Sequence, residues 1–224
     1  MKKQQKPYTT SIAVDVAVFT FTEHKLKILL IKRAYGPYTG FWALPGGFME
    51  KNETTLKAAM RVLKEKAGLK NFYLEQLYTF DASGRDPRGN IPTVAYFALV
   101  ADKKIKFGPG VNLQAPKFFE ARKLPALAFD HGNIIKYALK RLAAKLEYTS
   151  AASALLPRNF RLFDLQRIYE ETWGKKLNKR NFQKKYFSLK LIHSTGKVLS
   201  GGHHRPARLY TFASKKPAEL KRFF

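Results

Sequence analysis

Residues 47–69, GFMEKNETTLKAAMRVLKEKAGL, constrain the fold of this 224-residue chain more than any other stretch. A glycine opens the stretch, a Gly-Leu pair closes it, and the segment between them is expected to be helical from about residue 52 to 67. Asn52 is a candidate to cap the start of this helix. Gly68 can end it in the left-handed conformation. We expect its apolar face to consist of Leu56, Ala59, Met60 and Leu63.

The spacing of this stretch is similar to that of the Nudix box, G-x5-E-x7-R-E-U-x-E-E-x-G-U, in which U is aliphatic. The matching positions are Gly47, Glu53, Arg61, Leu63, Glu65, Gly68 and Leu69. Val62 and Lys66 stand where the box has glutamates. In Nudix hydrolases such glutamates hold Mg²⁺ or Mn²⁺ for the cleavage of nucleoside diphosphate derivatives, and magnesium needs hard oxygen ligands.

Valine offers no oxygen ligand, and Lys66 brings a cation to the place of a dication. We therefore expect the fold to be kept, with no metal ligands and no catalytic residues in this helix. Lys66 also suits the negative C-terminal end of a helix. A metal site rebuilt from Glu50, Glu53 and Glu65 is an alternative that the pattern does not indicate.

The charge balance points to a polyanionic partner. The chain has 42 Lys and Arg against 16 Asp and Glu, a formal net charge of +26. Such a field attracts nucleic acids, although a bias toward lysine that favours solubility is an alternative. Residues 158–224 carry 17 Lys and Arg against 4 Asp and Glu, so half of the excess lies in under a third of the chain.

The composition also bounds the cellular compartment. No apolar run approaches the roughly 20 residues of a membrane span, and the basic N-terminus lacks a signal-type apolar stretch. The chain has no cysteine, which excludes disulfides and thiolate metal sites. We expect a cytoplasmic protein that does not enter a membrane.

The pattern of apolar residues and breakers predicts an α/β domain followed by a smaller one. We expect strands at residues 11–22, 25–32, 72–80, 93–100 and 117–121. A turn at Glu23-His24 joins the first two strands, and a Gly/Pro-rich loop, 34–47, precedes the helix described above. A second helix is expected over residues 133–146. The segment 148–157 indicates a boundary, so the expected domains are residues 1–150 and 151–224.

The second domain follows the order of a winged helix. Helices are expected over residues 162–173 and 179–189, the first ended by Gly174 and the second capped by Asn178. A strand at 191–194, a turn at Thr195-Gly196, a loose GGHHRP segment and a strand at 208–212 complete the domain.

The whole chain resembles the Nudix-related transcriptional regulators of the NrtR type. The segments that carry the resemblance are FWALPGGF (41–48), RVLKEKAGL (61–69), YLEQLYTF (73–80), GRDPRG (84–89), VAYFALV (94–100), LPALAFDH (124–131), LQRIYEETWG (165–174), KRNFQKK (179–185) and RPARLY (205–210). The resemblance implies a Nudix-type α/β/α sandwich with a mixed sheet, followed by a C-terminal winged helix-turn-helix. In one departure, Arg161 stands where relatives often have a capping Ser or Thr.

The resemblance also implies partners. It indicates a homodimeric bacterial repressor that binds double-stranded operator DNA near NAD-metabolism genes and requires no cofactor. Its effector is often ADP-ribose or another NAD-related nucleotide, whereas some relatives respond to a pentose such as arabinose. A Nudix pyrophosphatase with an accessory basic domain and a general nucleic-acid binder are the rival hypotheses.

Candidate effector-binding residues lie mainly in two glycine-containing segments. In GRDPRG, arginine can pair with phosphate and aspartate can accept from ribose hydroxyls, although a solvated turn is the alternative. In WALPGG, backbone amides are candidates to face an anion. Trp42 is as well suited to the core as to stacking, and His131 is expected to be structural. The full candidate set is Arg33, Trp42, Gly46, Gly47, Glu65, Arg85, Asp86 and Arg88.

Candidate DNA-binding residues lie on the helix predicted over 179–189 and on the wing. Phe182, Tyr186 and Leu189 recur at i, i+4 and i+7 and are expected to pack inward, so polar neighbours face the major groove. Arginine suits guanine, and Asn or Gln suits adenine, while lysines suit phosphates. The candidates on the helix are Lys179, Arg180, Asn181, Gln183, Lys184 and Lys185. The candidates on the wing are His203, His204, Arg205 and Arg208.

Overall fold

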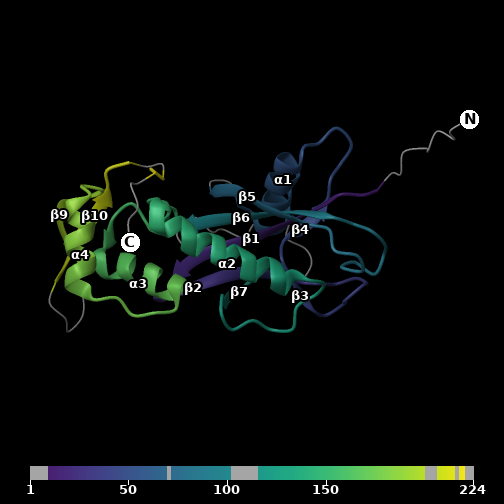
Figure 1. The fold of residues 1–224 in the computed structure, drawn as a ribbon, viewed down its shortest axis with the longest axis horizontal. Coiled ribbons are helices and arrows are strands. Elements are labelled where there is room, and N and C mark those ends of the chain that lie inside the picture. Colours follow the sequence, from purple (N-terminus) through teal and green to yellow (C-terminus); the bar gives the residue numbers. More distant parts are fainter. Residues whose placement is uncertain (1–9, 70–71, 102–115, 200–205, 215–216, 220–224) are drawn as a thin grey trace, which may run out of the picture.

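The structure is a computed structural model that describes residues 10–69, 72–101, 116–199, 206–214 and 217–219. The molecule is elongated (Figure 1). A large sheet with helices forms one end, and a helical unit with a small sheet forms the other. No helix among the described residues is long and apolar enough to cross a bilayer.

A seven-stranded mixed sheet forms the framework of the large end. Its central order is β3-β2-β1-β6-β5, with β4 paired to β1 and β7 paired to β2. β1 and β6 are parallel, and the other pairs are antiparallel. The strands are β1 (Ala13–Thr22), β2 (Lys25–Lys32), β3 (Trp42–Ala43), β4 (Gly46–Phe48), β5 (Tyr73–Phe80), β6 (Thr93–Ala101) and β7 (Lys117–Glu120). Glu23 and His24 both have positive φ, at 52° and 59°, which suits a two-residue hairpin and confirms the predicted turn.

Two helices cover opposite faces of this sheet (Figure 1), α1 (Thr55–Ala67) on one side and α2 (His131–Tyr148) on the other. The alternation of β1 explains this arrangement, because successive side chains point to opposite faces of a strand. Val16 and Val18 pack in a buried cluster with α1, while Phe19 packs in the cluster that contains α2. The expected α/β/α sandwich is confirmed.

The start and the apolar face of α1 differ from the prediction. Thr54 caps the helix by accepting from Lys57 N, whereas Asn52 lies two residues earlier with φ 63°. Leu56 and Met60 are about half exposed. Ala59 and Leu63 pack against the sheet as predicted, together with the smaller residues Ala58, Val62 and Ala67. The prediction followed side-chain size, but close approach of a helix to β1 and β4 admits small side chains.

The far end of the molecule has the expected winged-helix order. It contains η2 (Ala151–Leu155), β8 (Phe160–Arg161), α3 (Leu162–Trp173), α4 (Lys179–Ser188), β9 (Ile192–Leu199) and β10 (Ala207–Phe212). The strands form a sheet in the order β8-β10-β9. Gly174 ends α3 with φ 70°, and Asn178 caps α4 by accepting from Asn181 N, as predicted. Arg161 precedes α3 without a capping hydrogen bond and pairs with Asp164 instead.

The turn predicted at Thr195-Gly196 is wrong, because β9 continues through it to Leu199. Gly196 has φ 70°, and the pairing register with β10 shifts between Arg208 and Tyr210. These are the features of a β-bulge, in which an extra residue bends a strand without ending it. The Thr195-Gly196 pair was predicted to end the strand, whereas it lies at a bulge inside the strand.

The hydrophobic core is continuous across residue 150. One buried cluster contains sheet residues such as Phe19, residues of η2 such as Leu155, and residues of α3 such as Ile168. Trp173 Nε1 also donates to Ala143 O in α2 at 3.1 Å. The division into domains 1–150 and 151–224 stays a prediction.

Candidate functional site: an electropositive cavity and a basic helix

A cavity of about 200 Å³ opens beside the amino end of β1. It is lined by residues of β1, the end of β2, β3 and β4, by the end of α1 and by the loop 84–89, together with Phe129 and His131. The sheet thus places residues distant in sequence around one space. Of the sequence-predicted effector residues, the lining includes Arg33, Gly46, Gly47, Arg85, Asp86 and Arg88.

Arg85 lines the cavity, but its guanidinium group is engaged inside the protein. Nε and Nη2 donate to the two carboxylate oxygens of Asp130, at 3.0 and 2.7 Å, and Nη1 donates to Ile91 O. The side chain is only 4% exposed. This bidentate pair holds the loop 84–89 against α2, so Arg85 shapes the wall of the cavity.

Arg88 and Asp86 form a second pair with more exposure. Arg88 Nη2 and Nε donate to the Asp86 carboxylate at 2.6 and 2.9 Å, and the guanidinium lies over the ring of Phe48. Hydrogen bonds from Arg88 hold the pKa of Asp86 below its usual value. The Arg88 side chain is 42% exposed and Asp86 only 4%, so the guanidinium can contact a ligand while Asp86 remains its partner.

Lys66 and Arg33 add positive charge. Lys66 is half-buried and donates to Gly46 O; among the described residues it forms no ion pair. Burial lowers the pKa of Lys66, while Asp15 opposes that shift. Arg33 donates to the carbonyls of Pro37 and Gly36 and lies over the ring of Phe129. With Arg85 and Arg88, the lining contains four cationic side chains against two carboxylates, Asp15 and Asp86.

Gly46 and Gly47 line the cavity from a strand rather than from the loop that the sequence suggested. They lie in β4, paired antiparallel with Asp15 and Val14 of β1. A Cβ at Gly46 would lie 2.1 Å from Asp15 Oδ1, so glycine is needed there for close approach of the strands. The WALPGG segment therefore contributes space for the Asp15 side chain and a carbonyl for Lys66.

Trp42 and Glu65 do not line the cavity. Trp42 packs edge-to-face on Phe119 at 4.7 Å between ring centroids, against the main core. Glu65 is exposed and pairs with Arg61, four residues earlier on the helix, at 3.4 Å.

Sequence reasoning missed Asp15 and Phe129, although a lone acid in the apolar strand AVDVAVFTFT was a signal for Asp15. His131, expected to be structural, accepts from Leu44 N through Nδ1 at 2.9 Å, and burial lowers its pKa.

Exposed aromatic side chains lie in the cavity lining and next to it. Phe48 lines it and is 40% exposed, and Tyr38, 39% exposed, contacts the lining residue Phe129 at 4.8 Å between ring centroids. Phe41 packs edge-to-face on Tyr38. Such surfaces suit an aromatic base or a sugar face, and nothing in the sequence set them apart from core aromatics.

The residues at α1 do not fit the divalent metal site of a Nudix hydrolase. Val62 is fully buried, and its Cγ2 lies 3.2 Å from a Cβ built on Gly47. The ammonium group of Lys66 stands in the cavity. Glu50, Glu53 and Glu65 all pair with Arg61, whose hydrogen bonds lower the pKa of Glu53 to about 2. In the described part of the chain, no three His, Asp or Glu side chains group as metal ligands.

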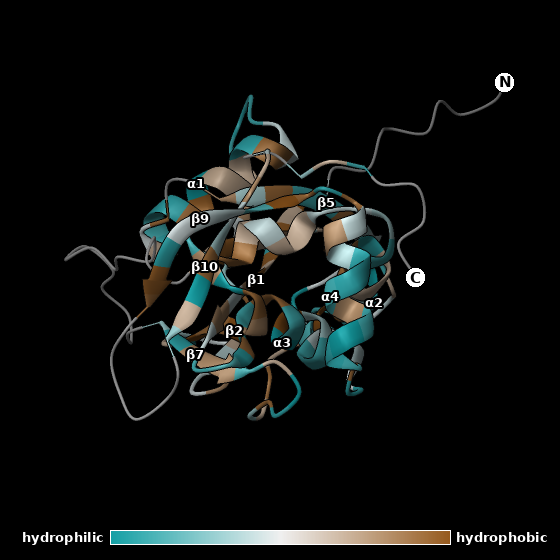
Figure 2. Cartoon of the chain, turned by 90° about the vertical axis from the view of Figure 1, so that its left-hand side faces the viewer, coloured by the Kyte–Doolittle hydropathy of each residue, from teal (hydrophilic) through white to brown (hydrophobic). Residues whose placement is uncertain are grey.

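The second candidate surface is α4. Phe182 and Tyr186 are buried, and Leu189 is half-buried, as the periodicity predicted. Figure 2 views this end of the molecule and shows α4 largely hydrophilic. The exposed candidates are Lys179, Arg180, Asn181 and Lys184, while Gln183 and Lys185 are half-buried. Arg208 is exposed on β10, and His203, His204 and Arg205 lie outside the described residues.

Comparison with known families matches both halves of the chain. A model of the NUDIX domain matches residues 10–140. A model described as the NrtR DNA-binding winged helix domain matches residues 152–212.

Similar proteins extend these matches. The chain is 37% identical to the ADPR responsive transcriptional repressor NtrR of Acinetobacter baylyi, over 94% of this chain and 85% of the relative. It is 38% identical to an ADP-ribose pyrophosphatase of Methanocaldococcus jannaschii, over 60% of this chain and 79% of the relative. The crystal structure of Shewanella oneidensis NrtR complexed with a 27mer DNA superposes with a TM-score of 0.81 at 31% identity, covering 95% of this chain and 99% of that one. With both domains matched in this order, the chain belongs to the family of Nudix-related transcriptional regulators, NrtR.

Proposed function

We propose that this protein is a transcriptional repressor that binds operator DNA and responds to ADP-ribose or a related NAD-derived nucleotide. Its target genes would belong to NAD metabolism. The winged helix supplies the DNA-binding face, and the electropositive cavity supplies the effector site. A cytoplasmic location, a homodimeric state and the absence of a required cofactor belong to the same proposal. The relative from Acinetobacter baylyi, named as an ADPR responsive repressor, supports it.

Lys66 is the single observation that carries the effector part. A half-buried ammonium group without an ion pair costs free energy, which an anionic ligand would recover. Arg33 and Arg88 line the same cavity, and arginine pairs well with phosphate. A diphosphate placed among these three cations would be held by charge-assisted hydrogen bonds. A neutral pentose would leave Lys66 uncompensated, so the cavity favours a nucleotide over a sugar.

The same residue argues against hydrolysis. Nudix cleavage depends on divalent metal held by the helix carboxylates, and here a cation and a buried valine stand at two of those positions. We infer that the ligand is held without metal and is not cleaved. Because the chain is 38% identical to an ADP-ribose pyrophosphatase over 60% of its length, a pyrophosphatase remains the rival hypothesis.

Calorimetric titration with ADP-ribose, in EDTA and again in Mg²⁺, tests this proposal. We expect equal affinity in the two buffers and no release of AMP. Lys66→Gln should weaken binding about tenfold, near the loss of one charge-assisted hydrogen bond. Lys64→Gln, an exposed lysine of the same helix turn, is the matched control and should bind normally. Mg²⁺-dependent AMP release would establish the enzyme, and binding of a pentose alone would establish a sugar sensor.

A mobility-shift assay on the chain's own promoter region tests the DNA part. We expect tighter binding to that DNA than to random duplex of equal length, and a change of affinity when ADP-ribose is added. Equal affinity for both duplexes would instead support the general nucleic-acid binder. Light scattering of the free protein would decide whether it is a dimer.

A further inference from the structure

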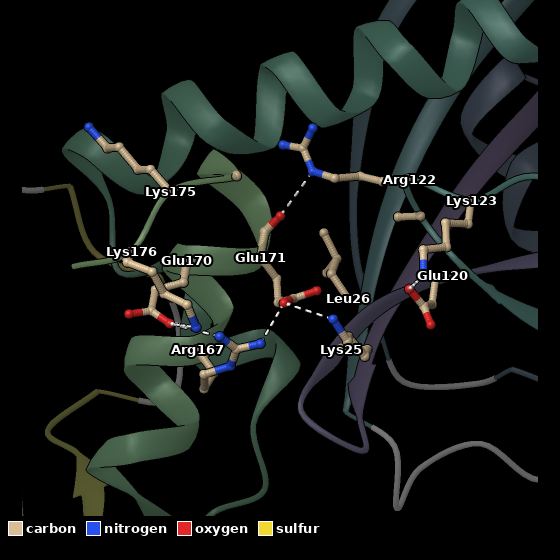
Figure 3. A pocket seen from close by; sticks show the side chains of 12 residues that line it. Lys25, Leu26, Glu120, Arg122, Lys123, Arg167, Glu170, Glu171, Lys175 and Lys176 are labelled. Atoms are coloured by element: carbon tan, nitrogen blue, oxygen red, sulfur yellow. Dashed lines mark hydrogen bonds and ion pairs between the residues drawn. The ribbon is translucent and has the colours of Figure 1, made fainter.

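A second cavity, of about 350 Å³, lies between the two ends of the molecule (Figure 3). The start of β2 and the residues after β7 form one wall, and the C-terminal half of α3 forms the other. Its lining is mostly charged, and the charges are largely paired across the gap or along α3. This gap is therefore a joint held by polar contacts, in contrast to the apolar core beside it.

Arg122, two residues after β7, caps the C-terminus of α3. Its Nη2 donates to Thr172 O at 2.7 Å and its Nε to Glu171 O at 3.3 Å. The last carbonyls of a helix have no partner within the helix, and a cation suits this negative end. Gly174 N–H satisfies the carbonyl of Glu170 at 2.8 Å. A helix of the DNA-binding end is thus completed by a side chain of the sensor end.

Glu171 and Glu170 continue the connection toward α4. The Glu171 carboxylate pairs with Lys25 of β2 at 3.4 Å and with Arg167 at 2.6 Å. Arg167 also donates to Glu170 at 2.8 Å. Glu170, 7% exposed, accepts from the backbone N–H of Leu177 at 3.0 Å, in the turn that leads into α4. Three side chains therefore link β2 to the entry of the candidate DNA-reading helix.

β2 reaches the effector cavity at its other end. Lys25 begins β2, while Ile31 near its end and Arg33 just beyond it line the cavity. β7 pairs with β2 from Leu30↔Lys117 to Lys27↔Glu120 and leads directly to Arg122. β2, paired antiparallel with β7 along part of its length, therefore runs from the candidate ligand site to the joint.

We propose that Arg122 and Glu171 are positioning residues that fix the orientation of the DNA-binding end on the sensor sheet. They are the contacts through which a ligand-induced shift of β2 and β7 reaches α4. The positioning role stands on the geometry alone, and the response to ligand rests on the proposed function. A coupling route requires a demonstrated change between two states. The positioning role and the response to ligand are therefore tested by separate measurements.

Pulsed electron paramagnetic resonance tests the positioning part without ligand or DNA. The chain has no cysteine, so nitroxide labels can be attached at Lys64→Cys in α1 and Ser188→Cys in α4, both exposed. We expect one narrow distance distribution in the labelled parent and a broader or shifted one in Arg122→Gln and in Glu171→Gln. Arg122→Lys, which keeps the charge but not the fork of donors, should be intermediate.

Lys123→Gln is the matched control, because Lys123 is 80% exposed and pairs with Glu120 of its own segment. It should leave the distance distribution unchanged. Circular dichroism must show that each variant is folded. An unchanged distribution in both Arg122→Gln and Glu171→Gln would overturn the positioning role.

The ratio of operator Kd values with and without ADP-ribose tests the coupling part. This ratio commonly lies between about 5 and 150 in regulated proteins. We expect it to fall toward 1 in Arg122→Gln, while the affinity for ADP-ribose itself stays within about twofold of the parent. Full coupling in both variants would overturn the role in signal transfer. A ratio of 1 in the parent protein would contradict the proposed function, while the label distances would still decide the positioning role.

Discussion

At the residue scale, the two departures from the Nudix box are each accommodated by their neighbours. Val62 is buried against the strand that contains Gly47, and Lys66 donates to the carbonyl of Gly46. Restoring glutamate at position 62 would place a carboxylate in an apolar cluster with Val14 and Ala58, which is costly without a partner. The packing of α1 therefore disfavours a carboxylate at position 62.

Arg85 and Arg88 should separate a structural role from a binding role. Arg85→Ala leaves Asp130 partly buried without its bidentate partner, and breaking such a pair costs roughly 3–5 kcal/mol. We expect that loss in the free energy of unfolding measured with urea. Arg88→Ala leaves the Asp86 carboxylate, 4% exposed, with the backbone N–H of position 88 as a remaining donor, so it should cost less, about 1–3 kcal/mol, and should also lower ADP-ribose affinity. Equal stability losses in the two variants would contradict this division.

The sequence predicted part of this site for physical reasons. GRDPRG lies between two strands, and arginine in such a loop favours anions. The position of this loop at a ligand cavity could therefore be predicted from the sequence. The sequence could not show that Arg85 forms an internal ion pair, because its partner Asp130 lies 45 positions away and no local pattern links the two residues. Trp42 and Phe129 illustrate the same limit, because an aromatic ring carries no local sign of whether it packs in a core or lines a cavity.

At the element scale, helix caps were predictable and helix faces were less so. Gly68, Gly174 and Asn178 act where their backbone preferences require. The face of α1 was misjudged because the neighbouring strands select side chains by the space available. The bulge at Gly196 was misjudged because pairing with β10 outweighs the local turn preference of Thr-Gly.

Glu170 should give the α3–α4 connection a characteristic response to pH. Burial alone would raise its pKa, but hydrogen bonds from Leu177 N–H, Gln166 and Arg167 outweigh burial and bring the pKa to about 2, below the ordinary 4.5. A depressed pKa stabilises the fold above pH 4.5, and this contribution is lost as the pH falls from 4.5 toward 2.

Glu170→Gln removes that titration. We expect it to lower the free energy of unfolding by about 1–3 kcal/mol at pH 7, with the two proteins converging as the pH approaches 2. Urea unfolding at a series of pH values measures this difference. A difference that stayed constant from pH 7 to pH 2 would show that the ionised carboxylate contributes nothing to the connection.

At the scale of the whole molecule, the net charge of +26 acts on DNA affinity more than on recognition. Phosphate contacts position a protein on DNA, and base contacts specify the sequence. The exposed side chains of α4 include both kinds, with Lys184 suited to phosphate and Arg180 to a guanine edge. The two roles should separate in a titration of operator binding against salt.

Lys184→Ala should lower the slope of log affinity against log salt by about one, equally for operator and random duplex. Arg180→Ala should cost about 1–3 kcal/mol on operator and relax the preference at one base pair. Lys136→Ala, an exposed lysine of α2, is the control and should change neither slope nor preference. An Arg180 variant that weakened both duplexes alike would assign that residue to phosphate.

The cap that Arg122 provides to α3 bears on how freely such proteins can be recombined. A winged helix excised from this chain would lose the apolar contacts that it shares with the large sheet and the donor for two helix-terminal carbonyls. A chimera that joins it to another ligand-binding sheet would need a donor of equal reach after the strand equivalent to β7. The two ends of this molecule are separate in sequence, but they are not interchangeable parts.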